Sequence, residues 1–106
     1  MLENNYNIKF TPKANDDLKE IYSYISSKLF AQNEADNLLE RMETSIMRLK
    51  ELPFSCNFVA DEYLKNKGYR KLMVDNYIVF YLVEEMEKKV IIMRVLYGRQ
   101  KYKDIL

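Results

Sequence analysis

Apolar and polar residues alternate from Tyr6 to Phe10, which is typical of a half-buried strand. Thr11 and Pro12 then supply an N-cap and a first helical residue, so we expect a helix to begin there and to run to about Leu29. Its core-facing stripe consists of Ala14, Leu18, Ile21, Tyr22, Ile25 and Leu29. The solvent face is expected to carry Lys13, Asp17, Lys19 and Glu20.

A second amphipathic helix is predicted before Pro53, which ends its pattern. Asn33 and Asp36 have the spacing of a capping pair at the start of this helix. The apolar stripe consists of Ala35, Leu38, Leu39, Met42, Ile46 and Leu49. Because only a few residues join the two helices, we expect them to form an antiparallel hairpin.

The C-terminal half has the pattern of a small sheet. Residues 57–60 favour a short strand and residues 61–67 a polar loop, and three further strands are predicted over residues 69–74, 77–84 and 89–97. Asp75-Asn76 has the composition of a two-residue hairpin turn, and residues 85–88 form a looser one. These strands therefore make an antiparallel meander, with apolar residues on both of its faces.

The order of elements predicts an α+β fold. An N-terminal strand and a two-helix antiparallel hairpin pack on one face of a mostly antiparallel sheet of about four strands. A chain of 106 residues is long enough for one hydrophobic core, so we expect a single domain over residues 1–106.

Composition narrows the chemistry. One cysteine and no histidine exclude an internal disulfide, the Ser-His and Cys-His nucleophile pairs and the usual zinc ligands, so no metal or cofactor is expected. Cys56 is interpreted as a partly buried loop residue. No apolar run is long enough for a bilayer, and residues 1–5 do not resemble a signal peptide, so a cytoplasmic protein without membrane contact is expected.

The net charge is only +1, but the C-terminal half is the more basic one. Two clusters lack acidic residues; they are Lys65, Lys67, Arg70 and Lys71, and Arg94, Arg99, Lys101 and Lys103. Arg70 and Arg94 are expected near strand ends, where guanidinium groups can bind phosphate in a bidentate manner. Gly98 frees the chain to turn, and Tyr97 and Tyr102 can stack on a base or donate a proton. Alternatively, both tyrosines cover the end of the sheet and Arg99 pairs with Asp104.

Taken together, several segments resemble the RelE/ParE superfamily of toxins from bacterial type II toxin–antitoxin modules, which includes plasmid stabilisation proteins. The segments are Phe10-Thr11-Pro12-Lys13-Ala14, Asp17-Leu18 with Ile21 and Tyr24-Ile25, Leu49 with Leu52-Pro53, Gly68-Tyr69-Arg70-Lys71-Leu72, Asn76-Tyr77-Ile78-Val79-Phe80-Tyr81 and Arg94-Val95-Leu96-Tyr97-Gly98-Arg99. The resemblance covers nearly the whole chain and implies two N-terminal helices packed on an antiparallel sheet.

The resemblance also implies a function. RelE-like members cleave mRNA in the ribosomal A site without a metal, and by match Arg70, Arg94 and Arg99 would bind phosphate while Tyr97 or Tyr102 donates a proton. Lys65, Lys67 and Glu51 are alternative candidates for the general base, and Lys71, Lys101 and Lys103 for contacts with RNA. This mRNA endoribonuclease, which would inhibit translation, is the leading hypothesis of the sequence analysis.

Two alternatives remain open. ParE-like members of the superfamily poison DNA gyrase, and the segment from Arg94 to Arg99 resembles them equally well. An inactive module that only binds its antitoxin is the third possibility. In every case the resemblance implies a cognate antitoxin whose extended region wraps the toxin. The basic strand ends imply acidic residues in that region.

Overall fold

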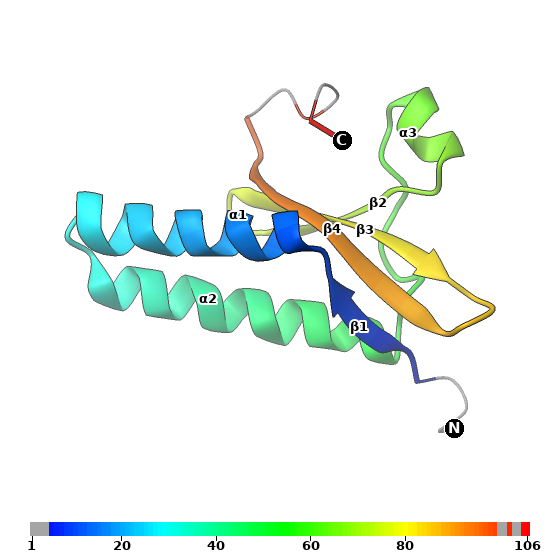
Figure 1. Cartoon of the computed structure of the whole chain (residues 1–106), viewed down its shortest axis with the longest axis horizontal. Coiled ribbons are helices and arrows are strands. Elements are labelled where there is room, and N and C mark those ends of the chain that lie inside the picture. Colours follow the sequence, from blue (N-terminus) through cyan, green and yellow to red (C-terminus); the bar gives the residue numbers. More distant parts are fainter. Residues whose placement is uncertain (1–4, 100–101, 103–104) are drawn as a thin grey trace.

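Four strands form a mixed sheet in the order β1-β4-β3-β2 (Figure 1). The computed structural model describes residues 5–99, 102 and 105–106. The strands are β1 (Asn7–Phe10), β2 (Arg70–Val74), β3 (Tyr77–Glu84) and β4 (Lys89–Tyr97). β2, β3 and β4 pair antiparallel, which confirms the predicted meander, whereas β1 runs parallel to β4 at the edge. A β-bulge interrupts the pairing of β3 with β4 between Phe80 and Tyr81.

The first arm of the helical hairpin changes its geometry before it ends. Helix α1 (Pro12–Ser23) begins at Thr11, whose Oγ1 accepts a hydrogen bond from the Ala14 N–H at 3.0 Å. The same hydroxyl donates to the Met93 carbonyl at 2.9 Å, so the cap also fastens α1 to β4. The predicted helix continues toward Leu29, but residues Tyr24–Lys28 form a π-helical turn, η2.

The second arm starts without the predicted cap. Helix α2 (Gln32–Met47) has Ala31 at its N-cap position and no side-chain cap, so the proposed Asn33 and Asp36 capping pair is wrong. Asn33 lies inside the first turn, and Asp36 instead accepts a hydrogen bond from Tyr22 at 2.8 Å. This bond joins the two arms near their connection. A short 3-10 turn, η3 (Arg48–Lys50), extends α2 toward Pro53.

Residues 53–69 differ most from the sequence prediction. The short strand expected over residues 57–60 is a single bridge between Phe58 and Arg70. The expected polar loop contains a short helix, α3 (Glu62–Asn66), which Asp61 caps by accepting from the Leu64 N–H at 3.1 Å. Leu64 is buried, so this segment is a packed part of the fold.

Both faces of the sheet carry a core, as its apolar pattern predicted. The larger core lies between the sheet and the helical hairpin and includes Leu38, Met42, Ile46, Leu49, Val79, Tyr81, Val90, Ile92 and Val95. The smaller core lies on the other face and includes Val59, Leu64, Tyr69, Ile78, Phe80 and Leu96. Tyr102, Ile105 and Leu106 pack against this smaller core. The chain therefore covers part of the second face itself, with α3 and its C-terminal residues.

Candidate functional site

Arg70 opens β2 and points to the hairpin side of the sheet. It pairs with Tyr81, which belongs to the larger core. Its Nη1 donates to the Cys56 carbonyl at 2.7 Å, and its guanidinium carbon lies 4.0 Å from the Phe58 ring centroid and 5.1 Å from that of Phe54. We call this group of Arg70, Phe54, Phe58 and Cys56 the Arg70 anchor. Arg70 therefore contributes to packing.

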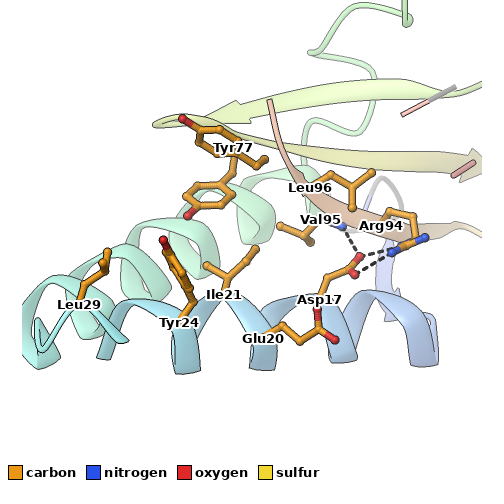
Figure 2. A pocket seen from close by; sticks show the side chains of 10 residues that line it. Asp17, Glu20, Ile21, Tyr24, Leu29, Tyr77, Arg94, Val95 and Leu96 are labelled. Atoms are coloured by element: carbon orange, nitrogen blue, oxygen red, sulfur yellow. Dashed lines mark hydrogen bonds and ion pairs between the residues drawn. The ribbon is translucent and has the colours of Figure 1, made fainter. Parts of the chain in front are cut away.

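Arg94 is held by a carboxylate that the helical pattern had assigned to the solvent face. Asp17 of α1 is buried, and its two oxygens accept from Nε and Nη2 of Arg94 at 2.7 and 2.8 Å. Asp17 also accepts from the Val95 N–H at 2.9 Å (Figure 2). The hydrogen bonds that Arg94 donates to Asp17 raise the pKa of Arg94. We call this group of Asp17, Arg94 and Val95 the Asp17 junction.

The Asp17 junction has a structural origin in the end of β1. β1 pairs with β4 only as far as Ile92, and the Thr11 N–H still donates to the Ile92 carbonyl. Beyond that point β4 still pairs with β3 but no longer with β1, and on the β1 side Asp17 accepts a hydrogen bond from the backbone N–H of Val95. Buried backbone donors need such acceptors, so the carboxylate completes the edge of the sheet. The period of the helix alone gave no signal of this role.

The two predicted basic clusters do not form one site. Arg70 lies on β2 at one edge of the sheet, whereas Arg94 lies on β4, with β3 between them, and reaches toward α1. Tyr97 pairs with Tyr77, whereas Arg70 pairs with Tyr81. Neighbouring residues of a strand rise by about 3.3 Å, so Tyr97 lies roughly 13 Å from Arg70 along the strands alone. Tyr97, one of the two predicted acids, is thus far from Arg70, one of the predicted phosphate ligands.

The candidate bases are similarly dispersed. Lys71 pairs with Phe80 of the smaller core, so it points to the face opposite Arg70. Lys65 and Lys67 are exposed on and after α3, and Lys67 lies 4.7 Å from the Tyr63 ring centroid. Glu51 is exposed behind η3. Their roles remain predictions.

The end of β4 closes against the β2–β3 turn. The Gly98 N–H donates to the Asn76 carbonyl at 2.8 Å, and a Cβ at Gly98 would lie 3.1 Å from that oxygen. Gly98 thus permits a close approach of two backbones. Tyr102 packs on Phe80, as the alternative of a covered sheet end expected, and Arg99 is exposed. Lys101, Lys103 and Asp104 lie outside the described residues, so their predicted contacts remain predictions.

A groove of about 780 Å³ lies between α1 and the free part of β4. Figure 2 shows its lining, with Asp17 and Arg94 at one end and tyrosines at the other. It is lined by Asp17, Glu20, Ile21, Tyr24, Leu29, Tyr77, Arg94, Val95, Leu96 and Tyr97. The rings of Tyr77 and Tyr97 pack edge to face, and burial raises the pKa of Tyr77. We call this hollow the tyrosine groove.

Tyr81 is a buried polar residue that the sequence analysis did not single out. Its hydroxyl donates to the Pro53 carbonyl at 3.0 Å, which fastens the loop that also carries Cys56. Burial, and then the Cys56 thiol, raise the pKa of Tyr81 far above its ordinary value. Cys56 itself is partly buried in this loop, as predicted.

Within the described residues, no cluster of three or more histidine, cysteine, aspartate or glutamate side chains could hold a metal ion. Nor does any helix in that part of the chain have the length and apolarity to cross a membrane.

Comparison with known sequences decides the family. Residues 8–102 match the family described as the ParE toxin of type II toxin-antitoxin system, parDE. The chain belongs to this family. It is therefore a toxin of the type II toxin–antitoxin class, within the RelE/ParE superfamily that the sequence resembles. No curated protein matches the chain.

Solved structures agree with the ParE fold. A chain of the chromosomal ParDE system from Pseudomonas aeruginosa is similar with a TM-score of 0.71 and 20% identity, covering 87% of this chain and 95% of that one. A chain of the RelBE2 complex from Mycobacterium tuberculosis is similar with a TM-score of 0.59 and 19% identity, covering 88% of this chain and 98% of that one. YafQ from Escherichia coli is similar with a TM-score of 0.53 and 18% identity, covering 87% of this chain and 92% of that one. At these identities the likeness concerns the fold alone.

Proposed function

We propose that this ParE-family toxin inhibits DNA gyrase by binding and does not cleave mRNA. The observation that carries the proposal is the dispersal of the groups that a nuclease would need: β3 separates Arg70 on β2 from Arg94 on β4, and Tyr97 lies at the far end of the strands from Arg70. Membership of the ParE family supports the same choice. This reverses the order of preference that the sequence alone suggested.

Metal-free cleavage of RNA requires a base, a cation and an acid within reach of one phosphate. The charge of Arg94 is compensated by Asp17 in a bidentate pair, and its Nε and Nη2 are occupied. Arg70 donates a hydrogen bond to the Cys56 carbonyl, and the neighbouring Lys71 points to the opposite face of the sheet. An inhibitor that acts through binding needs none of these alignments.

The proposal is tested by measuring both activities on one preparation. Purified toxin is titrated into a gyrase supercoiling assay, and mRNA ends are mapped in a translating ribosome extract. We expect inhibited supercoiling and intact mRNA. Cleaved mRNA with unaffected gyrase would overturn the proposal in favour of the ribosome-dependent nuclease. If neither activity appears and induction leaves growth unchanged, the chain is an inactive antitoxin-binding module.

The variant Arg70→Ala distinguishes a catalytic role of Arg70 from an anchoring role in the same assays. Loss of a cationic contact to a transition state costs about 10² to 10³ in rate, whereas an anchoring arginine affects toxicity only through stability. We therefore expect Arg70→Ala to retain gyrase inhibition at temperatures where it is folded. Circular dichroism on the same sample checks the fold.

We also propose that the toxin forms a complex with a cognate antitoxin, as in the toxin–antitoxin complexes among the structural relatives. The exposed Arg99, with Lys101 beside it in the sequence, supports an acidic wrapping segment on that side. Reversing both charges should weaken the complex, and raising the ionic strength should do so too. Copurification followed by titration at two salt concentrations measures this. Unchanged binding by the charge-reversed variant would move the contact to the helices.

A further inference from the structure

The connection between the two helices of the hairpin contains two uncommon backbone conformations. Residues Tyr24–Lys28 form a π-helical turn instead of continuing α1. Phe30 has a φ of 49°, in the left-handed region that bulky side chains rarely adopt. π-helical turns are uncommon and occur frequently at functional sites, and strained residues also gather there. Such a strained conformation persists only where packing within the protein or a function compensates for its free-energy cost.

The described part of the chain supplies little packing in return. The side chain of Phe30 is 90% exposed, and those of Tyr24 and Leu29 are each 54% exposed. We call these three residues the hairpin tip. Single exposed apolar residues are common on protein surfaces, but adjacent large ones at a strained turn mark an interaction surface.

The hairpin tip is continuous with the tyrosine groove. Tyr24 and Leu29 line the groove themselves, and Tyr77 lies across from them (Figure 2). Tyr97 also lines the groove. Aromatic residues with a polar hydroxyl are enriched in protein–protein interfaces and dominate their energetics. Tip and groove together form one surface, with a projecting ring at its end and a hollow behind it.

Charge indicates the kind of partner. Glu20, Glu34 and Asp36 lie on the neighbouring turns of the two arms, and Lys28 is the only basic residue among the described positions from 20 to 36. This region is net negative, so it does not attract a nucleic-acid backbone. A protein surface with an apolar pocket and a basic rim is complementary to it.

The position of the hairpin tip favours the toxin's target over its antitoxin. Figure 1 shows the connection of the two helices projecting beyond the end of the sheet, far from the β3–β4 turn. A protruding ring can enter a pocket of a larger folded protein. Arg99, which suits an acidic wrapping segment, follows the end of β4, whereas the hairpin tip belongs to the connection between the two helices.

We propose that the hairpin tip is the surface by which the toxin binds its target protein, with the Phe30 ring inserted into an apolar pocket of gyrase. This inference rests on the proposed function. It assigns the target contact to Tyr24, Leu29 and Phe30, and it leaves the basic end of the sheet to the antitoxin.

Phe30→Gly tests the proposal without threatening the fold. Glycine adopts a positive φ readily, so the variant removes the ring and the strain together. We expect a melting temperature within a few degrees of the parent chain and a loss of gyrase inhibition of about 10-fold or more, as for an interface hot spot. Phe30→Leu, which keeps an apolar side chain, should restore part of the inhibition. Affinity for the antitoxin should be unchanged.

Met86→Gly is the matched control. Met86 is 92% exposed in the β3–β4 turn, so it is an equally accessible large apolar side chain far from the hairpin tip. We expect it to inhibit like the parent chain. A Phe30→Gly variant that inhibits supercoiling fully would overturn this inference alone, and one that loses only antitoxin binding would reassign the surface to the antitoxin. A parent chain that leaves gyrase active would overturn both proposals.

Discussion

The Asp17 junction and the Arg70 anchor each hold an arginine against the same sheet, but with different partners. At the junction a buried carboxylate takes two hydrogen bonds from Arg94 and a third from the Val95 backbone. At the anchor Arg70 has one neutral carbonyl acceptor and two aromatic rings. The positive charge of Arg94 is therefore compensated by a buried carboxylate, whereas that of Arg70 lies against a neutral carbonyl and two rings.

This difference shows why residue type alone could not assign the arginines. A guanidinium that faces a buried carboxylate is committed to the fold, because removal of either partner leaves the other charge uncompensated. A guanidinium that packs on rings is bound more weakly, and its charge stays available to an anion. The stability of variants at the two places should differ accordingly.

Asp17→Ala should have the largest effect. It leaves Arg94 without its counter-charge and the Val95 N–H without an acceptor at the edge of β4. Breaking a buried ion pair from one side costs about 3 to 5 kcal/mol, so the variant should unfold at much lower urea concentration than the parent chain. Equilibrium urea denaturation followed by circular dichroism measures the change.

Asp16→Ala is the control for this change, because Asp16 is the exposed neighbour on the same helix. It should alter the free energy of unfolding by less than about 0.5 kcal/mol. Asp17→Asn, which keeps an acceptor for Val95, should fall between the two variants. Equal stability of Asp17→Ala and Asp16→Ala would show that the junction contributes nothing to folding.

Tyr81→Phe should be next in size and should act on the loop of the Arg70 anchor. The variant deletes the hydroxyl that donates to the Pro53 carbonyl and leaves that buried residue without this donor. An unsatisfied buried acceptor costs about 1 to 3 kcal/mol. Thermal denaturation measures the loss of stability, with Tyr77→Phe as the control because the Tyr77 ring is only partly buried. If the two variants melt together, the loop is held by Arg70 and its rings.

Alkaline pH should weaken the same loop. Burial raises the pKa of Tyr81 in the folded chain above the ordinary tyrosine value of about 10, so the unfolded chain loses this proton first. The contribution of Tyr81 to stability is therefore complete below about pH 10. Above that pH it falls by at most about 1.4 kcal/mol per pH unit. Urea denaturation at pH 9 and above should show a smaller decline for Tyr81→Phe than for the parent chain.

Much of the fold could be predicted because periodicity reports burial. The apolar stripe of α2 includes Leu38 and Met42, and β3 and β4 contain apolar runs. Only one arrangement of the helix and sheet layers buries all of these residues. Asp17 could not be predicted in this way. A carboxylate on the polar side of a helical stripe is normally solvated, and its burial here depends on β1 ending before β4 does.

The candidate site was less predictable than the fold for a related reason. Nearness in sequence placed Arg70 and Lys71 in one basic cluster, but consecutive residues of a strand point to opposite faces. The hairpin tip gave no sequence signal either, because a Leu29-Phe30 pair at the end of an apolar stripe is typical of a core. Its residues are exposed at the connection between the helices, where a π-helical turn ends the first arm and Phe30 has a positive φ.

Arg70→Ala tests the weaker of the two arginine sites. The variant loses one charge-assisted hydrogen bond to Cys56 and the contacts with the rings of Phe58 and Phe54. These interactions together are worth about 1 to 2 kcal/mol in a partly exposed place. Arg70→Lys should keep part of the contact with the rings and therefore lose less stability than Arg70→Ala. A loss as large as that of Asp17→Ala would make the anchor as essential to folding as the junction.

Arg41→Ala should have the smallest effect and isolates the role of burial. Arg41 of α2 donates Nε and Nη2 to Asp75 in the β2–β3 turn, so it pairs with a carboxylate as Arg94 does. Its side chain is 51% exposed, whereas that of Arg94 is 17% exposed. Exposed pairs contribute about 0.2 to 1 kcal/mol, and salt screens them. Urea denaturation in low and high salt should therefore show a small loss that disappears at high ionic strength, while the loss in Asp17→Ala persists. A salt-independent loss of several kcal/mol in Arg41→Ala would mean that pairing geometry, and not burial, distinguishes the Asp17 junction.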